Sequence, residues 1–365
     1  MRYYIIAGEA SGDLHGSNLI KALQRQDPEA DFRCWGGDKM QANGARLVKH
    51  YRDLAFMGFV EVLKHLGTIL NNIKFCKKDI QQYKPDVLIL IDYPGFNLRI
   101  AEWAKKQGLR IVYYISPQIW AWKENRIHLI KRSVDKMLVI LPFEQDFYKR
   151  HQYEVSYVGH PLTEVIDAEL QKPAEKLCEQ PIIALLPGSR SQEIKKKLPV
   201  MLSMVAKFPQ YQFYIAQAPG QEAQLYYNII GNLPVKLVQH QTYNLLKQAS
   251  AALVTSGTAT LETALFGVPQ VVCYKGNPVS YWLARKLIKV KYISLVNLIL
   301  DKPAVRELIQ QELNEAALYE SLNELLHNVE HKEALQSDYT RLWELLGTHK
   351  ASDLAAREIM AMSIS

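Results

Sequence analysis

Short apolar runs alternate with amphipathic, helix-like stretches along most of this chain. In the first half, apolar and β-branched runs predict strands at residues 3–7, 87–91, 111–115, 136–141 and 155–158. Between them, apolar residues recur at helical spacing, for example at residues 14–24 and 97–107. Most of the runs are apolar at nearly every position, which is typical of parallel strands buried on both faces.

The alternation begins again after residues 169–180, a polar segment with Pro173 that is typical of a linker. The later strands are predicted at residues 182–186, 212–216, 235–238, 251–254 and 270–273. Two such arrays predict an α/β protein with two Rossmann-like, doubly wound parallel-sheet domains that face a cleft. We expect the domains at residues 1–168 and 181–339. The last helical segment, 340–365, could pack back on the first domain.

Composition narrows the class of protein. The 365 residues are enough for two domains, and 48% hydrophobic with 22% charged residues argues against disorder. A net charge of +7 suits an anionic partner, such as nucleic acid, an acidic membrane face or a phosphorylated substrate. No low-complexity basic tail is present, so we expect no nucleic-acid partner.

Cysteine usage and the start of the chain indicate the compartment. Cys34, Cys76, Cys178 and Cys273 are far apart and show no zinc-binding spacing, so reduced thiols are expected. A strand-like run at the start leaves no room for a signal peptide, and no apolar run reaches the ~20 residues that span a bilayer. We therefore expect a cytoplasmic protein whose membrane contact, if any, is peripheral.

Ligands of parallel sheets bind beyond the carboxyl ends of the strands, so the loops there are the places to search for chemistry. The first such loop is Gly8-Glu-Ala-Ser-Gly-Asp13. Its glycines let the backbone turn tightly and approach a ligand, and the next helix offers free N–H groups. It is neither a Gly-x-Gly-x-x-Gly fingerprint nor a P-loop. The alternative is a plain tight turn with Asp13 as the helix cap.

A buried strand brings Asp92 to its carboxyl end, just before a turn at Pro94 and Gly95. A carboxylate held there can act as a general base, or it can bond to neighbouring loop amides. The next loop combines Trp120 and Trp122 with Ser116 and Gln118. These side chains could line a sugar or acyl pocket, or the rings could pack in the core.

Two loops of the second domain are suited to a nucleotide. Gly188, Ser189 and Arg190 follow a strand, and backbone N–H groups with a guanidinium can neutralise a diphosphate, although Arg190 could also be a surface residue. Ser256-Gly-Thr258 opens a helix whose N-terminus can hold phosphate. Glu262 lies about one turn further along the same helix face, where its carboxylate can accept both ribose hydroxyls.

The features of the second domain resemble the nucleotide-binding half of GT-B glycosyltransferases. The whole ordered set of motifs resembles the lipid-A-disaccharide synthase family, glycosyltransferase family 19, from about residue 3 to residue 310. The motifs that carry this resemblance are Gly8-Glu-Ala-Ser-Gly-Asp13, Phe56-Met-Gly-Phe-Val-Glu-Val62, Ile91-Asp-Tyr-Pro-Gly-Phe-Asn97, Ser116-Pro-Gln-Ile-Trp-Ala-Trp122, Leu186-Pro-Gly-Ser-Arg190, Ser256-Gly-Thr-Ala-Thr-Leu-Glu262 and Tyr292-Ile-Ser-Leu-Val-Asn-Leu298. Many relatives have an acidic residue where Gly95 stands, so a second carboxylate has no role there.

The resemblance implies a reaction and a set of contacts. The family joins UDP-2,3-diacylglucosamine to 2,3-diacylglucosamine 1-phosphate with a β-1,6 linkage and releases UDP, without a cofactor. The implied acceptor-binding residues are Gly8, Glu9, Ser11, Gly12, Asp13, Ser116, Gln118 and Trp120. The implied UDP-sugar-binding residues are Gly188, Ser189, Arg190, Glu193, Ser256, Gly257, Thr258, Glu262, Lys275 and Asn297.

The implied mechanism is a single displacement. The acceptor 6-hydroxyl attacks the anomeric carbon opposite UDP, an α-linked donor gives a β-product, and Asp92 is the expected base. The chain contains no Asp-x-Asp, the usual metal-binding motif of metal-dependent glycosyltransferases, so no metal site is expected. Arg190, the start of the helix that carries Glu262, and Lys275 would stabilise the departing UDP instead.

Because both implied substrates are acylated, the expected place of work is the inner face of the cytoplasmic membrane. Residues 57–78 and 281–291 combine apolar and basic side chains and could lie in that interface, although the first segment, taken alone, favours a core helix with a solvated face. A homodimer is left open. Two other functions remain: an enzyme similar to UDP-N-acetylglucosamine 2-epimerase, and a nucleotide-sugar-binding protein without catalysis.

Overall fold

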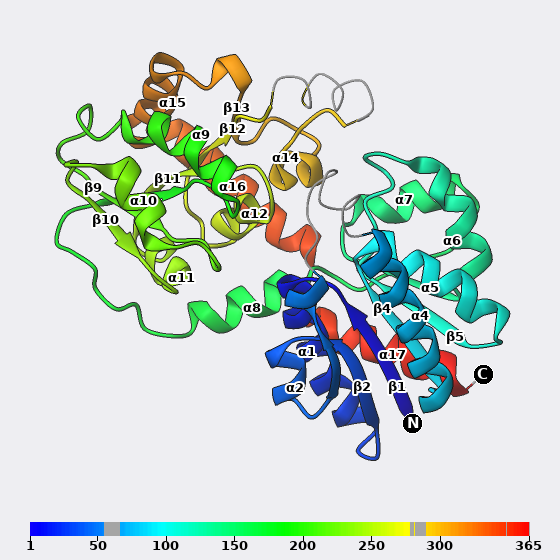
Figure 1. Ribbon diagram of the computed structural model, residues 1–365. Helices are drawn as coiled ribbons and strands as arrows, with labels where there is room; N and C mark the ends of the chain where they lie inside the picture. The colour runs from blue at the N-terminus through cyan, green and yellow to red at the C-terminus, as the bar shows by residue number, and fades with distance from the viewer. Residues whose placement is uncertain (55–65, 278–280, 282–289, 348, 365) are drawn as a thin grey trace. The chain divides into compact units, whose positions relative to one another are not determined.

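The computed structural model describes residues 1–54, 66–277, 281, 290–347 and 349–364. The Phe56–Val62 motif and most of residues 281–291 therefore lie outside the described residues. The chain forms two compact units (Figure 1). The N-terminal unit comprises Met1–Pro161 and Leu346–Ser365, and the C-terminal unit comprises Leu162–Leu345. Each contains a parallel sheet, which confirms the predicted fold class.

Within the described part of the N-terminal unit, seven parallel strands are ordered β3-β2-β1-β4-β5-β6-β7. The strands are β1 (Arg2–Ala7), β2 (Asp31–Gly36), β3 (Arg46–His50), β4 (Val87–Ile91), β5 (Arg110–Tyr114), β6 (Lys136–Val139) and β7 (Ser156–Tyr157). The helices are α1 (Ala10–Gln26), α2 (Asp38–Ala42), η1 (Tyr51–Leu54), α4 (Leu66–Tyr83), α5 (Pro94–Lys106), η2 (Glu124–Arg126), α6 (Ile127–Ser133), α7 (Phe143–Arg150) and α17 (Ala351–Ile364). The order reverses between β1 and β4, so the topological switch point lies at their carboxyl ends.

The C-terminal unit repeats the design with a sheet ordered β10-β9-β8-β11-β12-β13 in its described residues. The strands are β8 (Ile182–Leu186), β9 (Gln212–Ala216), β10 (Val235–Val238), β11 (Ala249–Thr255), β12 (Gln270–Tyr274) and β13 (Arg306–Ile309). The helices are α8 (Pro161–Leu170), α9 (Ser191–Leu202), α10 (Ala223–Ile230), α11 (Thr242–Leu246), α12 (Thr258–Leu265), α14 (Leu295–Leu300), η3 (Gln310–Glu312), α15 (Glu315–His327) and α16 (Val329–Leu346). Its switch point lies between β8 and β11.

The sequence pattern predicts the central strands and misses three others. β4 and β8 are buried at every position, as continuous apolar runs require. β2, β3 and β13 contain charged residues and are partly exposed, so they lack that pattern. The segment interpreted as a linker, 169–180, lies within the C-terminal unit, where the backbone N–H groups of Glu175 and Leu177 donate to side chains of α11 and the residues after it.

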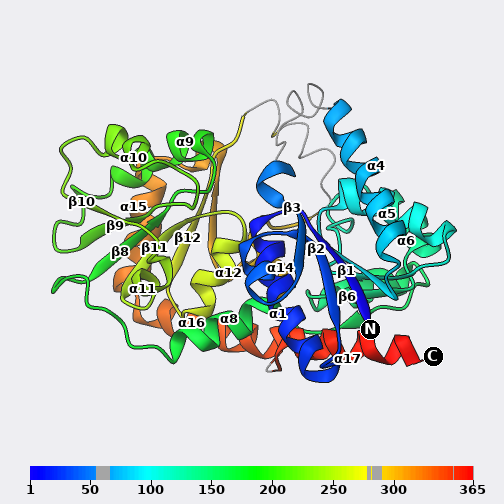
Figure 2. The same ribbon diagram turned by 60° about the horizontal axis from the view of Figure 1, so that its bottom comes forward.

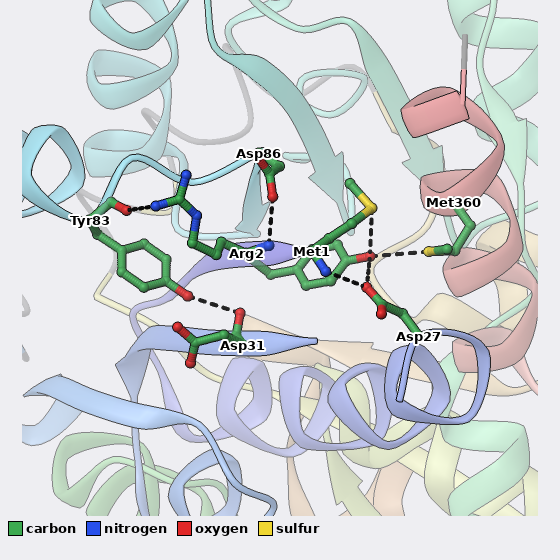
Figure 3. A network of polar contacts seen from close by, with 8 residues as sticks. Met1, Arg2, Asp27, Asp31, Tyr83, Asp86 and Met360 are labelled. Atoms are coloured by element: carbon green, nitrogen blue, oxygen red, sulfur yellow. Dashed lines mark hydrogen bonds and ion pairs between the residues drawn. The ribbon is translucent and has the colours of Figure 1, made fainter. Parts of the chain in front are cut away.

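Side chains close the amino edge of the N-terminal sheet, opposite the switch point (Figure 3). The amino group of Met1 pairs with Asp27 at 2.8 Å, and the backbone N–H of Arg2 donates to Asp86 at 2.7 Å. The hydroxyl of Tyr83 donates to the carbonyl of Asp31 at 2.9 Å. These contacts join β1, α1, β2, α4 and the turn before β4, so the amino edge has a structural role.

The helix α17 completes the N-terminal unit although it follows the C-terminal unit in the sequence. It packs against α1, and Figure 2 shows it as the red helix running beneath the blue β1–α1 region. The hydroxyl of Tyr3 donates to the sulfur of Met360 on α17 at 3.1 Å. Through this contact the first strand of the sheet also touches the returning helix.

Asp13 joins α1 to the start of α2. Its carboxylate is 3% exposed and accepts the backbone N–H groups of Gly37, Lys39 and Met40 at 2.8, 3.1 and 3.1 Å. A β-carbon on Gly37 would stand 2.8 Å from this carboxylate, so glycine is required for the close approach. The side chain is thus committed to the fold of the first loop.

We expect Asp13→Asn to lower the free energy of unfolding by about 2 kcal/mol, because bonds from N–H groups to a charged acceptor are lost in a buried place. Urea unfolding followed by circular dichroism measures the change. Asp38→Asn is the matched control, since among the described residues this exposed carboxylate forms ion pairs only at the surface, at 3.5 Å, and its loss should cost about 0.5 kcal/mol or less. Equal midpoints for the two variants would contradict the role of Asp13.

Candidate functional site

The switch point of the N-terminal sheet places Asp92 directly after β4, beside the loop that follows β1. Asp92 and Tyr93 both have left-handed backbone conformations, with φ of +43° and +48°. Such angles are uncommon for residues other than glycine and persist where neighbouring groups enforce them. The Tyr113 hydroxyl and the Asn97 amide both donate to the carbonyl of Asp92, at 2.6 and 2.7 Å.

Asn97 also binds the strand ends. Its amide lies near the carbonyls of Ile91 and Ile6, at 3.2 and 3.4 Å, so one buried side chain reaches both β4 and β1. The loop after β1 contacts this turn directly as well, because a β-carbon on Gly8 would overlap the ring of Tyr93. The two loops are therefore fixed against each other, and Gly8 is required for close packing.

The environment of Asp92 adjusts its acidity. The pKa of Asp92 is raised to about 6, mainly by burial and in part by the negative charge of Glu9. A hydrogen bond from the backbone N–H of Tyr93 opposes this rise. A carboxyl group with such a pKa is largely ionised at neutral pH and is a stronger base than an ordinary aspartate. The structure thus brings together Asp92 and Glu9, which the sequence places far apart.

The other residues of the first loop divide into exposed and buried ones. Glu9 and Ser11 are exposed at the carboxyl edge, whereas Gly12 is buried against the β-carbon of Ala7. Asp13 faces inward to α2. Only the exposed members can meet a ligand directly in this conformation.

The loop after β5 rests on a buried carboxyl group that the sequence analysis missed. Glu144 accepts the backbone N–H groups of Ile140 and Leu141, at 3.2 and 2.9 Å. Burial raises the pKa of Glu144 to about 7, and interactions with Leu141, Ser116, Ile140 and Trp120 oppose this rise. The backbone partners of Glu144 lie three and four residues before it, but its contacts with Ser116 and Trp120 join separate parts of the chain, and no sequence motif marks them.

The aromatic residues of this loop have different surroundings. Trp120 is half-buried and packs edge-on against Phe143, with ring centroids 4.9 Å apart. Trp122 is 47% exposed, and the ammonium of Lys123 lies 4.3 Å from its ring centre. Ser116 is buried and bonds to the hydroxyl of Tyr148 at 2.6 Å, whereas Gln118 is exposed. Trp122 and Gln118 therefore form the accessible part of the loop.

In the C-terminal unit, the loop after β8 forms a second concentration of charge. Gly188 has a φ of +126°, which favours glycine. Arg190 precedes α9, and its guanidinium lies 3.7 Å from the carboxylate of Glu193. Ser189 is exposed beside it. The loop is a tight turn that requires glycine and has a guanidinium and a carboxylate close together at the switch point of the second sheet.

The start of α12 lies on the neighbouring strand end. Gly257 and Thr258 are exposed, and the Ser256 hydroxyl donates to the carbonyl of Ile293 at 2.8 Å. Glu262 is half-buried and accepts a hydrogen bond from the Tyr243 hydroxyl at 3.0 Å. Burial raises the pKa of Glu262, and the bond from Tyr243 opposes the rise. Tyr243 holds one carboxylate oxygen in place, which the sequence alone does not reveal.

Lys275 and Asn297 occupy different places. Lys275 directly follows β12, next to β11, and so lies at the carboxyl edge with Ser256. Asn297 is 1% exposed, and its amide exchanges hydrogen bonds with Val305 and donates to Glu307. Those bonds use the amide within the fold and connect α14 to the start of β13.

Comparisons with known proteins agree with this geometry. A family model described as lipid-A-disaccharide synthetase matches residues 3–361. A lipid-A-disaccharide synthase from Trichlorobacter lovleyi is 38% identical over 372 residues, which cover 99% of this chain and 97% of the relative. One from Nitrosococcus oceani is 39% identical over 357 residues, which cover 94% and 92%.

Solved structures show the same fold at low identity. A UDP-GlcNAc 2-epimerase from Neisseria meningitidis bound to UDP-GlcNAc has a TM-score of 0.70 at 12% identity and covers 99% of this chain and 100% of its own. The glycotransferase of kitacinnamycin has a TM-score of 0.67 at 13% identity and covers 100% and 99%. At such identities the likeness concerns the fold alone.

We expect Glu262→Gln to weaken UDP binding by roughly tenfold, because a charged acceptor contributes about 1.5–3 kcal/mol to a hydrogen bond and the amide retains part of it. Tyr243→Phe should have a smaller effect, since it removes the hydrogen bond that positions the Glu262 carboxylate but keeps the carboxylate itself. Calorimetric titration with UDP measures both. Glu320→Gln, an exposed change on α15, is the control for net charge. Unchanged affinity in Glu262→Gln would place the ribose site elsewhere.

Proposed function

Since the chain belongs to the lipid-A-disaccharide synthetase family, we propose that it joins UDP-2,3-diacylglucosamine to 2,3-diacylglucosamine 1-phosphate and releases UDP. The chain is a GT-B glycosyltransferase of lipid A biosynthesis, with a nucleotide-sugar donor and a sugar-phosphate acceptor. The linkage formed is β-1,6, with inversion at the anomeric carbon. The position and raised pKa of Asp92 are the observation that carries this proposal.

Asp92 is the proposed general base. Its carboxylate would accept the proton of the acceptor 6-hydroxyl as the oxygen attacks the anomeric carbon. The paired left-handed residues and the bonds from Asn97 and Tyr113 hold the backbone that presents it. The exposed loop residues Glu9 and Ser11 would contact the acceptor.

Trp122 and its cations suit an acylated sugar phosphate. An exposed indole ring offers an apolar face for a sugar, and Lys123 and Arg126, at 4.3 and 5.9 Å from its ring centre, offer positive charge for a phosphate. Gln118 lies exposed in the same loop. We assign this loop to the acceptor, with Ser116 and Trp120 supporting it from below.

The C-terminal unit would hold the donor. Backbone groups at Gly188 and Ser189 with the guanidinium of Arg190 would bind the diphosphate, together with the start of α12. Glu262 would accept the ribose hydroxyls. Lys275 would add positive charge as UDP leaves. Asn297, which the resemblance assigns to the UDP-sugar site, would support that site through its bonds to Val305.

The apolar and basic face of α4 supports work at a membrane surface. Among the residues that the structure describes, no helix is long and apolar enough to cross a bilayer. On α4, Leu70 and Phe75 are each 48% exposed, and Lys74 and Lys78 are exposed near them. Inserted apolar side chains with nearby lysines give reversible attachment to an anionic surface. We propose peripheral attachment at the inner face of the cytoplasmic membrane.

The proposed reaction is tested by mass spectrometry of the purified protein with both acylated substrates. We expect the disaccharide 1-phosphate and an equal amount of UDP. The epimerase-like alternative is supported only by a shared fold, and it predicts conversion of UDP-N-acetylglucosamine without an acceptor. The binding-only alternative predicts UDP affinity without product. Either outcome would overturn the proposal.

The acidity of Asp92 predicts the pH profile. Because the base acts when ionised and its pKa is about 6, kcat/KM should rise with pH through about 6 and level off above. Glu9→Gln removes a negative charge that raises this pKa, so the acidic limb should move to lower pH. Glu102→Gln, on the outer part of α5, should leave it in place.

If Asp92 is the base, replacing its carboxylate should reduce turnover. Asp92→Asn should reduce kcat by roughly 100-fold, the usual scale for a lost general base, while UDP affinity is unchanged. Rapid-quench kinetics and calorimetry measure the two quantities. Near-normal turnover in the folded variant, or an acidic limb that Glu9→Gln does not move, would remove Asp92 from this role.

A further inference from the structure

A buried lysine lies beneath the loop proposed to hold the diphosphate. Lys197, on α9, is 2% exposed, whereas its neighbours Lys195 and Lys196 are exposed. Its ammonium donates to the hydroxyl of Thr255 and lies 3.7 Å from the carboxylate of Glu193. Three successive lysines give no sequence signal that one of them is buried.

The ammonium lies at the switch point of the second sheet. Thr255 ends β11 and is followed by the Ser256–Thr258 turn. A β-carbon on Gly188 would come within 2.5 Å of Glu193 and 3.4 Å of the Lys197 nitrogen. Lys197 and Glu193 therefore lie directly under the backbone of the loop after β8, between the two segments assigned to the phosphates.

Burial of the Lys197 ammonium costs desolvation energy, which its neighbours offset. Burial lowers the pKa of Lys197, and the charge of Glu193 opposes that change. A buried ion is tolerated only when it is paired and hydrogen-bonded. Glu193 forms the ion pair with Lys197, and Thr255 accepts its hydrogen bond, so the three side chains form one polar cluster.

The resemblance assigns Glu193 to the UDP-sugar site, but the negative charge of its carboxylate would repel a diphosphate unless a cation balances it. Glu193 lies in the first turn of α9, 3.7 Å from the guanidinium of Arg190, and so offsets the positive charge of that side chain. The formal charges of Arg190 and Glu193 sum to zero. Lys197 on the other side of the carboxylate restores one positive charge to the loop, where a ligand with two phosphates requires it.

Resting on the proposed function, we propose that Lys197 is a positioning residue for donor binding: it balances Glu193 and thereby keeps the loop after β8 electropositive toward the diphosphate. Lys197 acts from beneath the loop, through Glu193 and Arg190. The ligand class is a nucleoside diphosphate or its sugar ester. The effect is on donor affinity, and the acceptor is not involved.

The test is a double-mutant cycle read by calorimetric titration with UDP. Lys197→Met should weaken UDP binding about tenfold, which corresponds to the loss of one charge interaction. Glu193→Gln should bind UDP at least as tightly as the wild type. In the double variant, affinity should return to within about threefold of Glu193→Gln, because no unbalanced carboxylate remains. Lys196→Met removes the same charge from the exposed neighbour and should change little.

The outcomes separate the possible roles of the lysine. If Lys197→Met binds UDP like the wild type, or if Glu193→Gln fails to rescue it, the proposal is wrong and Lys197 only supports α9 on the sheet. If Lys197→Met does not fold, Lys197→Gln, which retains a donor toward Thr255, replaces it in the same cycle. A folded wild type without UDP affinity would overturn the proposed function as well.

Discussion

The geometry at Asp92 depends on the hydrogen bonds that the side-chain amide of Asn97 donates. Two successive residues with left-handed backbone angles are unfavourable outside glycine, so the turn after β4 requires bonds that hold it. Asn97 supplies one to the Asp92 carbonyl and reaches the ends of β4 and β1. Because these strands flank the switch point, the same side chain sets the position of the proposed base and of the loop that contains Glu9. Packing of Gly8 against Tyr93 then fixes the loops as a pair.

In the C-terminal unit, charged side chains hold the loops at the switch point. Buried polar groups need partners, and at the second switch point Lys197, Thr255 and Glu193 satisfy one another. Further along, Asn297 and Glu307 hold the segment that approaches Ser256, whose hydroxyl bonds to Ile293. In both units, side chains committed to the fold lie immediately behind the exposed residues proposed to bind ligands. Stability and ligand geometry therefore depend on the same small sets of hydrogen bonds.

The sequence predicts what local pattern determines. Continuous apolar runs identify β4 and β8, and the rule of carboxyl ends leads from them to Asp92 and Gly188. The edge strands β2 and β3 contain charged residues and lack this pattern. Contacts between separate elements are beyond such reasoning. The bonds of Asp13 to the start of α2, the bonds of Asn297 to Val305, the contacts of Glu144 with Ser116 and Trp120, and the burial of Lys197 all depend on which elements become neighbours. The charge of Glu9 beside Asp92 belongs to the same group.

The return of α17 to the N-terminal unit imposes an order on biosynthesis. The surface of α1 that α17 covers is made early, but its partner helix emerges only after the entire C-terminal unit has been translated. At roughly 5–20 residues per second, the ribosome needs on the order of ten seconds or more to bridge that interval. During this time the nascent N-terminal unit contains the residues of its sheet but lacks α17, so any folding of the C-terminal unit during translation precedes completion of the first unit. A ribosome that stalls in the C-terminal unit therefore leaves the face of α1 that α17 covers exposed to chaperones.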